Sequence, residues 1–224
     1  MHGNRSADRP VSYPADLYDA FTRLGLDYYD RWFLLRFSQL YPARRRRPVL
    51  DVGVGTGQLL LRLAAVKGAE GCHFVGLDAF AEMVELAAAN VRAANSGSTP
   101  ISIVRSDAHS LPFADGAFGL VTSRSTLHHF RSPDVAVSEM YRVTGTGGVV
   151  LIHDVRRDAS PEVVAQFNAL RQRFGVPPTN LEEKLSMPEV ESLTRRLGLM
   201  DCTRIFSPRS GLGSLGYELL LHRR

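Results

Sequence analysis

Three glycines alternate directly after a short apolar run, and an acid stands just before the first of them. The acid is Asp51, within the run Val49–Val52, and the glycines are Gly53, Gly55 and Gly57. An apolar run, alternating glycines and a Leu-rich segment are typical of a strand, a tight turn and a helix. Glycine lets the backbone approach a ligand where a Cβ atom would clash. Because the first N–H groups of a helix lack partners within it, this turn favours binding of a polar ligand.

The spacing of the glycines separates two classes of ligand. A dinucleotide-binding turn has the pattern G-x-G-x-x-G, which would place its third glycine at position 58. Position 58 is Gln, and the pattern is D-x-G-x-G-x-G. The alternative without a ligand is an ordinary glycine-rich turn between a strand and a helix.

A second acid stands at a comparable place one strand later. Asp78 ends the next apolar run, and Ala79 and Met83 lie in the helical pattern that follows. A carboxylate there can accept hydrogen bonds from both hydroxyl groups of a ribose. In the alternatives, Asp78 caps the helix and Met83 packs in the core instead of contacting an adenine ring. The joint spacing with the glycines favours ligand binding.

Together with two later segments, these patterns resemble the four motifs of the class I S-adenosylmethionine (SAM) methyltransferases. Residues 51–57 match the first motif, and residues 75–83, 105–113 and 118–123 are similar to the other three. The resemblance is to the small-molecule type, similar to the ubiquinone/menaquinone biosynthesis methyltransferase family.

The resemblance implies SAM as cofactor, S-adenosylhomocysteine (SAH) as its product, and a role for each motif. Asp51 would orient the turn or accept a hydrogen bond from the amino group of SAM. Asp107 would bind the adenine amino group, with the backbone N–H of Ala108 on a ring nitrogen. The expected cofactor-binding residues are Asp51, Gly53, Gly55, Gly57, Asp78, Ala79, Met83, Asp107, Ala108 and Ser123.

Three residues at the carboxyl ends of the fourth and fifth predicted strands are candidates for a general base: His128, His129 and Asp154. Histidine titrates near neutral pH, and a base matters when the acceptor must lose a proton. In the alternatives, the histidine pair packs near the cofactor, and Asp154 caps a helix or pairs with Arg156 or Arg157. No C-x-x-C or H-E-x-x-H spacing is present, so we expect no metal site.

Apolar runs and amphipathic segments alternate from residue 49 onward, which predicts βαβ units and a mostly parallel sheet. With the resemblance, this predicts an α/β, three-layer, Rossmann-like methyltransferase fold, with seven strands and an antiparallel last strand. The predicted strands are 49–53, 73–78, 101–105, 118–123, one within 147–155, 200–206 and 216–222. Helices are predicted at 58–67 and 80–95, and others begin after Ser132, Ser160 and Ser186, the last with a capping box.

Two segments lie outside this alternation. Residues 1–47, which we expect to form an N-terminal helical cap, contain nine of the chain's nineteen aromatic residues, Tyr18 among them. One or two of the tyrosines are expected to line the site. We expect residues 156–185 to form a helical insertion in the SAM-binding domain, which we expect to span residues 48–224. These aromatic-rich additions favour a small-molecule acceptor, with aromatic acceptors as one class.

The charge of the chain does not favour a nucleic-acid partner. The net charge is +4, and the run 44–47 is four arginines. That run precedes the first strand, whereas ligands of open α/β sheets bind at the carboxyl ends of the strands. No apolar segment is long enough for a membrane span and no signal peptide is apparent, so we expect a cytoplasmic protein. Cys72 and Cys202 are expected to be buried free thiols in strands.

We therefore expect a SAM-dependent methyltransferase, of the EC 2.1.1 type, that moves the SAM methyl group to an O, N or C atom of a small molecule by in-line displacement. The alternatives are an RNA or protein methyltransferase, or a non-catalytic SAM-binding protein. A monomer and a homodimer both remain open, as does the identity of the acceptor.

Overall fold

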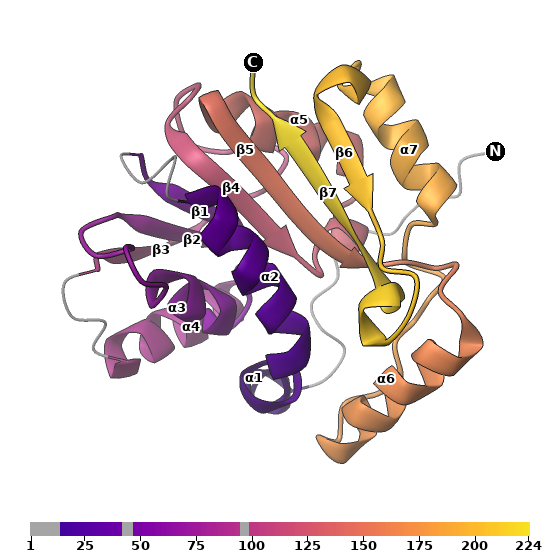
Figure 1. Cartoon of the computed structure of the whole chain (residues 1–224). Helices are drawn as coiled ribbons and strands as arrows, with labels where there is room; N and C mark the ends of the chain where they lie inside the picture. Colours follow the sequence, from indigo (N-terminus) through magenta and orange to yellow (C-terminus); the bar gives the residue numbers. More distant parts are fainter. Residues whose placement is uncertain (1–13, 42–46, 95–98) are drawn as a thin grey trace.

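A computed structural model describes residues 14–41, 47–94 and 99–224. The described part contains one seven-stranded sheet, of strand order β3-β2-β1-β4-β5-β7-β6 (Figure 1). In chain order the strands are β1 (Val49–Val52), β2 (Phe74–Asp78), β3 (Ile101–Arg105), β4 (Phe118–Arg124), β5 (Thr144–Val155), β6 (Thr203–Phe206) and β7 (Gly216–His222). Strands β1 to β5 are parallel, and β7 is antiparallel to both β5 and β6. The predicted architecture is confirmed.

Two strands, β5 and β6, begin three residues away from their predicted starts, and the other boundaries agree to within one residue. β5 begins at Thr144, because Phe118 of β4 already pairs with Thr144. β6 begins only at Thr203, because residues Met200–Cys202 form a 3₁₀ turn. Cys202 is therefore half-buried in a turn, and Cys72 is buried in the loop before β2, so neither lies in a strand as expected.

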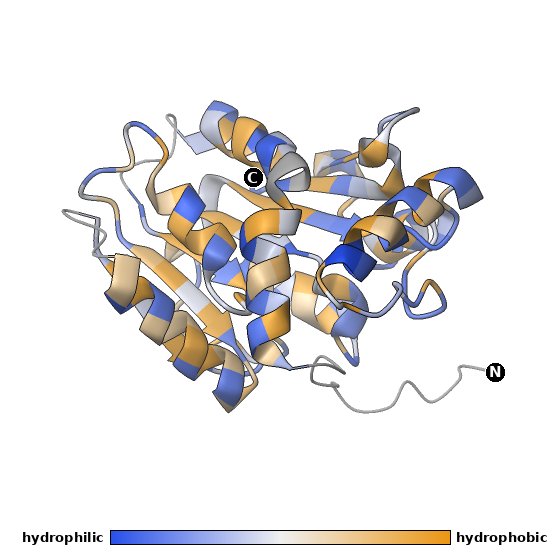
Figure 2. Cartoon of the chain, turned by 90° about the horizontal axis from the view of Figure 1, so that it is seen from below, coloured by the Kyte–Doolittle hydropathy of each residue, from blue (hydrophilic) through white to orange (hydrophobic). Residues whose placement is uncertain are grey.

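Helices cover both faces of the sheet. They are α1 (Ala15–Ala20), α2 (Asp27–Leu40), α3 (Gln58–Ala64), α4 (Ala81–Ala94), α5 (Pro133–Val143), α6 (Pro161–Arg173) and α7 (Met187–Arg196). Helices α2, α3 and α4 share one hydrophobic cluster with one face, and α5 and α7 share another with the opposite face. Figure 2 shows the mostly apolar strands between these helical layers.

Local sequence signals explain where some helices begin. Glu189 accepts a hydrogen bond from the backbone N–H of Ser186 at 2.7 Å, which completes the predicted capping box of α7. Ser160 precedes α6 and accepts from Val163 N at 3.5 Å. Ser132 stands at the N-cap position of α5, but its side chain makes no capping hydrogen bond.

The helices before β1 and the segment after β5 meet at one end of the sheet. A π-helix, Phe21–Gly25, joins α1 to α2. Phe21 and Leu26 pack with Val163 and Phe167 of α6 in a third hydrophobic cluster. Figure 1 shows α1 and α6 beyond the ends at which β4 and β5 finish. Both additions therefore lie near the carboxyl edge of the parallel strands.

Arg47, the described end of the arginine run, lies at the opposite edge of the sheet. Residues 44–46 are outside the described residues. Arg47 is exposed and donates to Gly116 O at 3.1 Å, just before β1 begins. No helix in the described part of the chain is long and apolar enough to cross a membrane.

Candidate active site

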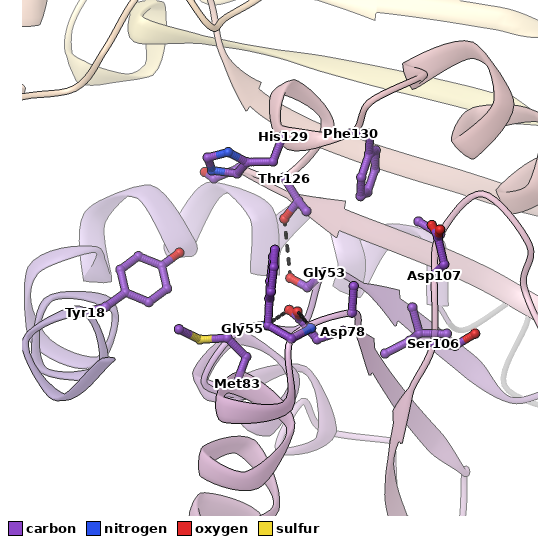
Figure 3. A pocket seen from close by; sticks show the side chains of 15 residues that line it. Tyr18, Gly53, Gly55, Asp78, Met83, Ser106, Asp107, Thr126, His129 and Phe130 are labelled. Carbon is purple, nitrogen blue, oxygen red and sulfur yellow. Dashed lines mark hydrogen bonds between the residues drawn. The ribbon is translucent and has the colours of Figure 1, made fainter. Parts of the chain in front are cut away.

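A cleft of about 680 Å³, part of it open to solvent, lies at the carboxyl ends of β1, β2 and β4. Figure 3 shows Tyr18 on one side of it, Asp107 on the other and Asp78 between them. Eight of the sequence-predicted site residues line this cavity: Gly53, Gly55, Asp78, Ala79, Met83, Asp107, Ala108 and His129. The carboxyl edge of the sheet thus brings most of the expected residues together.

Two of the three motif glycines form the floor of the cavity. Gly53 has φ +76°, and a Cβ atom there would lie 2.6 Å from Oγ1 of Thr126. Gly55 has φ +53° and lines the cavity. These values lie in the left-handed region, which glycine adopts at little cost.

Gly57 does not line the cavity, contrary to the expectation that it binds the cofactor. Its φ is +81°, and an added Cβ atom would lie 3.3 Å from Cα of Ala87 in α4. The glycine is therefore required for close packing of the start of α3 against α4.

Asp78 joins the glycine turn to the second strand. Its carboxylate accepts hydrogen bonds from Gly55 N at 2.9 Å and Phe80 N at 3.1 Å. Burial raises the pKa of Asp78, and the backbone hydrogen bonds oppose that rise. The residue lines the cavity with 8% of its surface exposed. It both orients the turn and offers oxygen atoms to a ligand.

Asp107 is oriented by a neighbour that sequence reasoning missed. Its Oδ1 atom lies 2.8 Å from His109 N and 2.5 Å from Nδ1 of His109. Nε2 of His109 accepts from Ser132 N at 3.1 Å, so the proton of a neutral ring must be on Nδ1. Burial opposes ionisation, but His109 and Arg131 together lower the pKa of Asp107. These hydrogen bonds hold the carboxylate of Asp107 in one orientation.

A smaller cavity of about 310 Å³ adjoins the first and shares Tyr18, Gly53 and Gly55 with it. Asp51 and Arg124 contribute the charged side chains of its wall. Oδ1 of Asp51 accepts from the hydroxyl of Thr122 at 2.8 Å. Burial raises the pKa of Asp51 to about 7, although Thr122 and Arg124 oppose the rise.

Arg124 is anchored to the N-terminal helices by a buried ion pair. Its Nη1 atom lies 2.7 Å from Oδ1 of Asp30 in α2, whose side chain is 0% exposed. Asp30 also pairs with Arg62 of α3. Nε of Arg124 has no hydrogen-bond partner among the described residues. A buried guanidinium with an unused donor beside the small cavity suits an anionic group of a ligand.

We expect Asp51→Asn to stabilise the protein, increasingly so at higher pH. The folded-state pKa of Asp51, about 7, lies above the ordinary value for an aspartate, 3.8. Folding therefore favours the protonated form, and the ionised form destabilises the fold as the pH rises from about 4 to 7. At 1.36 kcal/mol per pKa unit, the gain above pH 7 is at most about 4 kcal/mol.

Thermal unfolding at pH 5 and pH 8 measures this effect. Asp201→Asn, at an exposed position, is the matched control. If the gain in the unfolding temperature of Asp51→Asn over the wild type is no larger at pH 8 than at pH 5, the expectation is wrong.

Two of the candidate bases, His128 and Asp154, form a buried pair where β4 and β5 end. Nδ1 of His128 is 2.7 Å from Oδ1 of Asp154, and His128 N donates to Oδ2 at 3.1 Å. Asp154 is 0% exposed and lines neither cavity. Burial opposes ionisation of Asp154, but the charge and hydrogen bonds of His128 lower its pKa. Asp154 orients His128.

The two histidines have different environments. His129 lines the cavity, but burial and the charges of His128 and Lys184 lower its pKa to about 3. His128 is 8% exposed and does not line the cavity. The two rings are close, with centroids 3.9 Å apart.

Ser123 does not contact the cavity either, contrary to expectation. It is 0% exposed, and its hydroxyl donates to Val52 O at 2.8 Å. Side chains alternate between the faces of a strand. Thr122 and Arg124 therefore point to the α2 face, while Ser123 points away from it.

The N-terminal helices and a strained turn complete the wall. Tyr18 of α1 lines both cavities, in agreement with the expectation for the tyrosines. Oδ1 of Asp19 accepts from Gln58 and Asn90, each at 2.9 Å, which fixes α1 to α3 and α4. Ser125, which lines the larger cavity, has φ 55°, the one positive φ among the described non-glycine residues. No sequence signal marked Ser125.

The described ranges 14–41, 47–94 and 99–224 contain no group of three or more His, Cys, Asp and Glu residues that could hold a metal ion.

A family described as a methyltransferase domain matches residues 50–152. That range contains the glycine turn, Asp78, Asp107 and His128. Residues 50–152 thus form a methyltransferase domain that is similar to those of the class I SAM-dependent methyltransferases. The larger cavity lies where three motifs of this family meet.

Known members of the family share sequence and fold with the chain. The demethylmenaquinone methyltransferase of Thermus thermophilus is 33% identical over 62% of this chain and 60% of that protein. The ajmaline N-methyltransferase of Rauvolfia serpentina is 32% identical over 76% of this chain and 60% of its own length. A SAM-dependent methyltransferase from Aquifex aeolicus has a similar fold, with a TM-score of 0.66 at 21% identity, covering 94% of this chain and 98% of that one. The chain thus spans about 60% of the curated relatives named here.

Proposed function

We propose that the protein transfers the methyl group of SAM to a small-molecule acceptor. The observation that carries the proposal is the pair of adjoining cavities, with Asp78 and Asp107 in the larger and Asp51 and Arg124 in the smaller. SAM has an adenosine part at one end and an amino acid at the other, and these cavities offer suitable partners to each.

The residues fit the cofactor at both ends. Asp78 is placed to accept hydrogen bonds from the ribose, and Asp107 and Ala108 to bind the adenine edge. Asp51, once ionised, and Arg124 carry the charges opposite to those of an ammonium and a carboxylate. A Cβ atom at Gly53 would collide with the side chain of Thr126 in the cavity wall. When bound, SAM supplies a methyl group that its sulfonium charge makes electrophilic.

The protein must also align the acceptor with SAM and remove a proton from the acceptor. Holding two reactants in line contributes roughly 7–11 kcal/mol to barrier reduction. Asp154 holds Nδ1 of His128, and an ionised carboxylate there stabilises the imidazolium that forms when Nε2 accepts a proton. We assign His128 as the general base. His129, whose pKa is about 3, is a poor proton acceptor at neutral pH.

A small acceptor is supported by the covering elements and by the relatives. Tyr18 from the N-terminal helices lines both cavities. A demethylmenaquinone and an ajmaline methyltransferase are among the relatives, and both names denote small molecules. We propose the same class of acceptor for this chain, in preference to RNA or protein.

We expect Asp78→Ala to weaken SAH binding roughly 10- to 150-fold, because the loss of a charged hydrogen-bonding partner costs about 1.5–3 kcal/mol. Isothermal titration calorimetry with SAH and SAM measures the change, and Asp201→Ala is the matched control on the exposed surface. If the folded wild-type protein does not bind SAH, the proposed function is wrong.

Transfer itself is tested with radiolabelled SAM and two pools of acceptors. We expect label in a small-molecule metabolite extract and none in total RNA or protein. Label in RNA, with binding that weakens steeply as salt rises, would assign an RNA acceptor. SAH binding without any transfer would assign a non-catalytic SAM-binding protein.

A further inference from the structure

His109 is a half-buried histidine between the loop that follows β3 and the start of α5. Its ring contacts three groups: the carboxylate of Asp107, the backbone N–H of Ser132 and the edge of the Phe130 ring, with centroids 6.0 Å apart. Ser132 stands at the N-cap position of α5, whereas Asp107 and Phe130 line the larger cavity. The ring thus connects two parts of the cavity wall with the start of a helix.

The hydrogen bonds of the ring fix one oxygen of Asp107. Ser132 N donates to Nε2 at 3.1 Å, so Nε2 must carry a lone pair. A neutral ring then has its proton on Nδ1, which lies 2.5 Å from Oδ1 of Asp107. The backbone N–H of His109 donates to the same oxygen at 2.8 Å. Oδ1 therefore accepts two hydrogen bonds from one residue, and a rotation of the carboxylate would break both.

Oδ2 of Asp107 is the oxygen left for a ligand. Among residues 14–41, 47–94 and 99–224 it meets Nη2 of Arg131, at the long distance of 3.5 Å. The side chains of Asp107 and Arg131 are 46% and 53% exposed, so this ion pair is weak. Burial opposes ionisation of Asp107, but the hydrogen bonds of His109 and the charge of Arg131 lower its pKa. At neutral pH, Oδ2 is thus an acceptor that has no proton to donate.

We propose that His109 is the positioning residue that makes the cofactor site selective for a 6-aminopurine over a 6-oxopurine. This inference rests on the proposed function, in which Asp107 and Ala108 hold the adenine edge. A 6-aminopurine offers an amino donor to Oδ2 and an unprotonated ring nitrogen to the backbone N–H of Ala108. A 6-oxopurine reverses both groups, so that its carbonyl oxygen faces the carboxylate and its ring N–H faces that of Ala108. The selectivity requires Oδ2 to stay in place, and His109 holds it there.

The test compares SAH with S-inosylhomocysteine, in which a 6-oxo group replaces the 6-amino group and nothing else changes. Isothermal titration calorimetry gives both dissociation constants, and their ratio is the readout. A defect that is merely structural would weaken both ligands alike and leave the ratio unchanged. We expect the wild type to bind SAH roughly 100-fold or more tighter, because a site built to hydrogen-bond a donor rejects a ligand that lacks it.

Two substitutions of His109 separate its two ring nitrogens. His109→Asn has an amide nitrogen that can replace Nδ1, so it keeps the hydrogen bond to Asp107 and loses the one from Ser132. His109→Gln has an amide oxygen that can replace Nε2, so it keeps the contact with Ser132 and loses the one to Asp107. We expect His109→Gln to weaken SAH binding, and with it the ratio, roughly tenfold, and His109→Asn to retain the wild-type ratio. The reverse order would show that the ring only anchors α5, and it would overturn the inference, as would equal ratios in all three proteins.

Asp107→Asn tests the fixed orientation of the side chain without changing His109. The two donors of His109 should keep the carbonyl oxygen of the new amide at the place of Oδ1. The amide nitrogen then takes the place of Oδ2 and donates to a 6-oxo group. The ratio should shift toward S-inosylhomocysteine by at least about tenfold. An unchanged ratio would contradict the inference, so this variant decides the question if a His109 variant does not fold.

The controls separate this inference from the proposed function. His73→Gln, at an exposed position hydrogen-bonded to Ser102, should leave both affinities unchanged. Thermal unfolding shows whether each variant is folded at the temperature of the titration. If the wild type binds SAH and S-inosylhomocysteine equally, the inference is wrong and the proposed function stands. If the wild type binds neither ligand, the proposed function itself is wrong.

Discussion

His128→Asn is expected to lower kcat by roughly 10²–10⁴-fold, the usual contribution of a general base. The amide nitrogen of asparagine can replace Nδ1 and keep the hydrogen bond to Asp154, which is 2.7 Å in the wild type. The variant loses only Nε2, the nitrogen that we assign as proton acceptor. The fold and SAH affinity should therefore be retained while turnover is lost.

The measurement is single-turnover methyl transfer from bound SAM, with SAH affinity determined in parallel. His73→Asn, on the loop before β2 and hydrogen-bonded to Ser102, is a control far from the cavity. His129→Asn should reduce kcat much less than His128→Asn, because a group with a pKa of about 3 is a poor base at neutral pH. The reverse order would make His129 the base, and equal activity of His128→Asn and wild type would exclude His128.

The Asp154→Asn variant tests the role of the His128–Asp154 pair independently. The neutral amide cannot stabilise the imidazolium, and it can reverse the hydrogen bond so that the ring carries its proton on the wrong nitrogen. A loss of kcat similar to that of His128→Asn, without a matching loss of SAH affinity, is the expected outcome. If Asp154→Asn unfolds the protein, the comparison rests on His128→Asn alone.

Asp30→Ala is expected to destabilise the protein by about 3–5 kcal/mol, because breaking a buried ion pair leaves charges without a partner. The carboxylate of Asp30 is 0% exposed and pairs with both Arg124 and Arg62. At roughly 2–4 °C per kcal/mol for a chain of this size, the midpoint of thermal unfolding should fall by about 6–20 °C.

Differential scanning calorimetry measures the change, with Asp16→Ala at an exposed position of α1 as control. A double-mutant cycle with Arg124→Met isolates the pair: the double variant should be less destabilised than the sum of the single variants. Additive effects would show that Asp30 and Arg124 do not stabilise each other.

The same pair connects stability with cofactor binding. Arg124 lines the smaller cavity, and α2 supplies its counter-ion. Asp30→Ala should therefore also weaken SAH binding at temperatures where the variant is folded. Affinity equal to wild type in the folded variant would separate the two roles.

Local patterns in the sequence were sufficient for the strands, the turns and the cofactor motifs. Alternating glycines after an apolar run predict the turn at Gly53 and Gly55, because only glycine adopts these φ values at little cost. Asp78 and Asp107 follow the ends of neighbouring parallel strands, and such ends meet at one edge of the sheet. The capping box at Ser186 involves residues three apart, so it too is readable from sequence.

Only the tertiary structure decided which side chains reach the cavities and which pairs form. The direction of a strand residue depends on the face to which the register assigns it, so Ser123 and Arg124 point to opposite sides. Gly57 packs against α4, a contact that the motif does not encode.

The charged pairs join residues far apart in the chain. Arg124 meets Asp30, and His128 meets Asp154, because β1, β4 and β5 lie side by side and the helices pack on particular faces. Lys184 is buried beside β5 through one bridge between Leu185 and Arg156. Short-range patterns in the sequence thus predicted the alternation of strands and helices and the glycine turn, and the family resemblance implied the antiparallel last strand and the cofactor motifs. The orientation of the base and the burial of Lys184 depend on long-range packing, which no local pattern records.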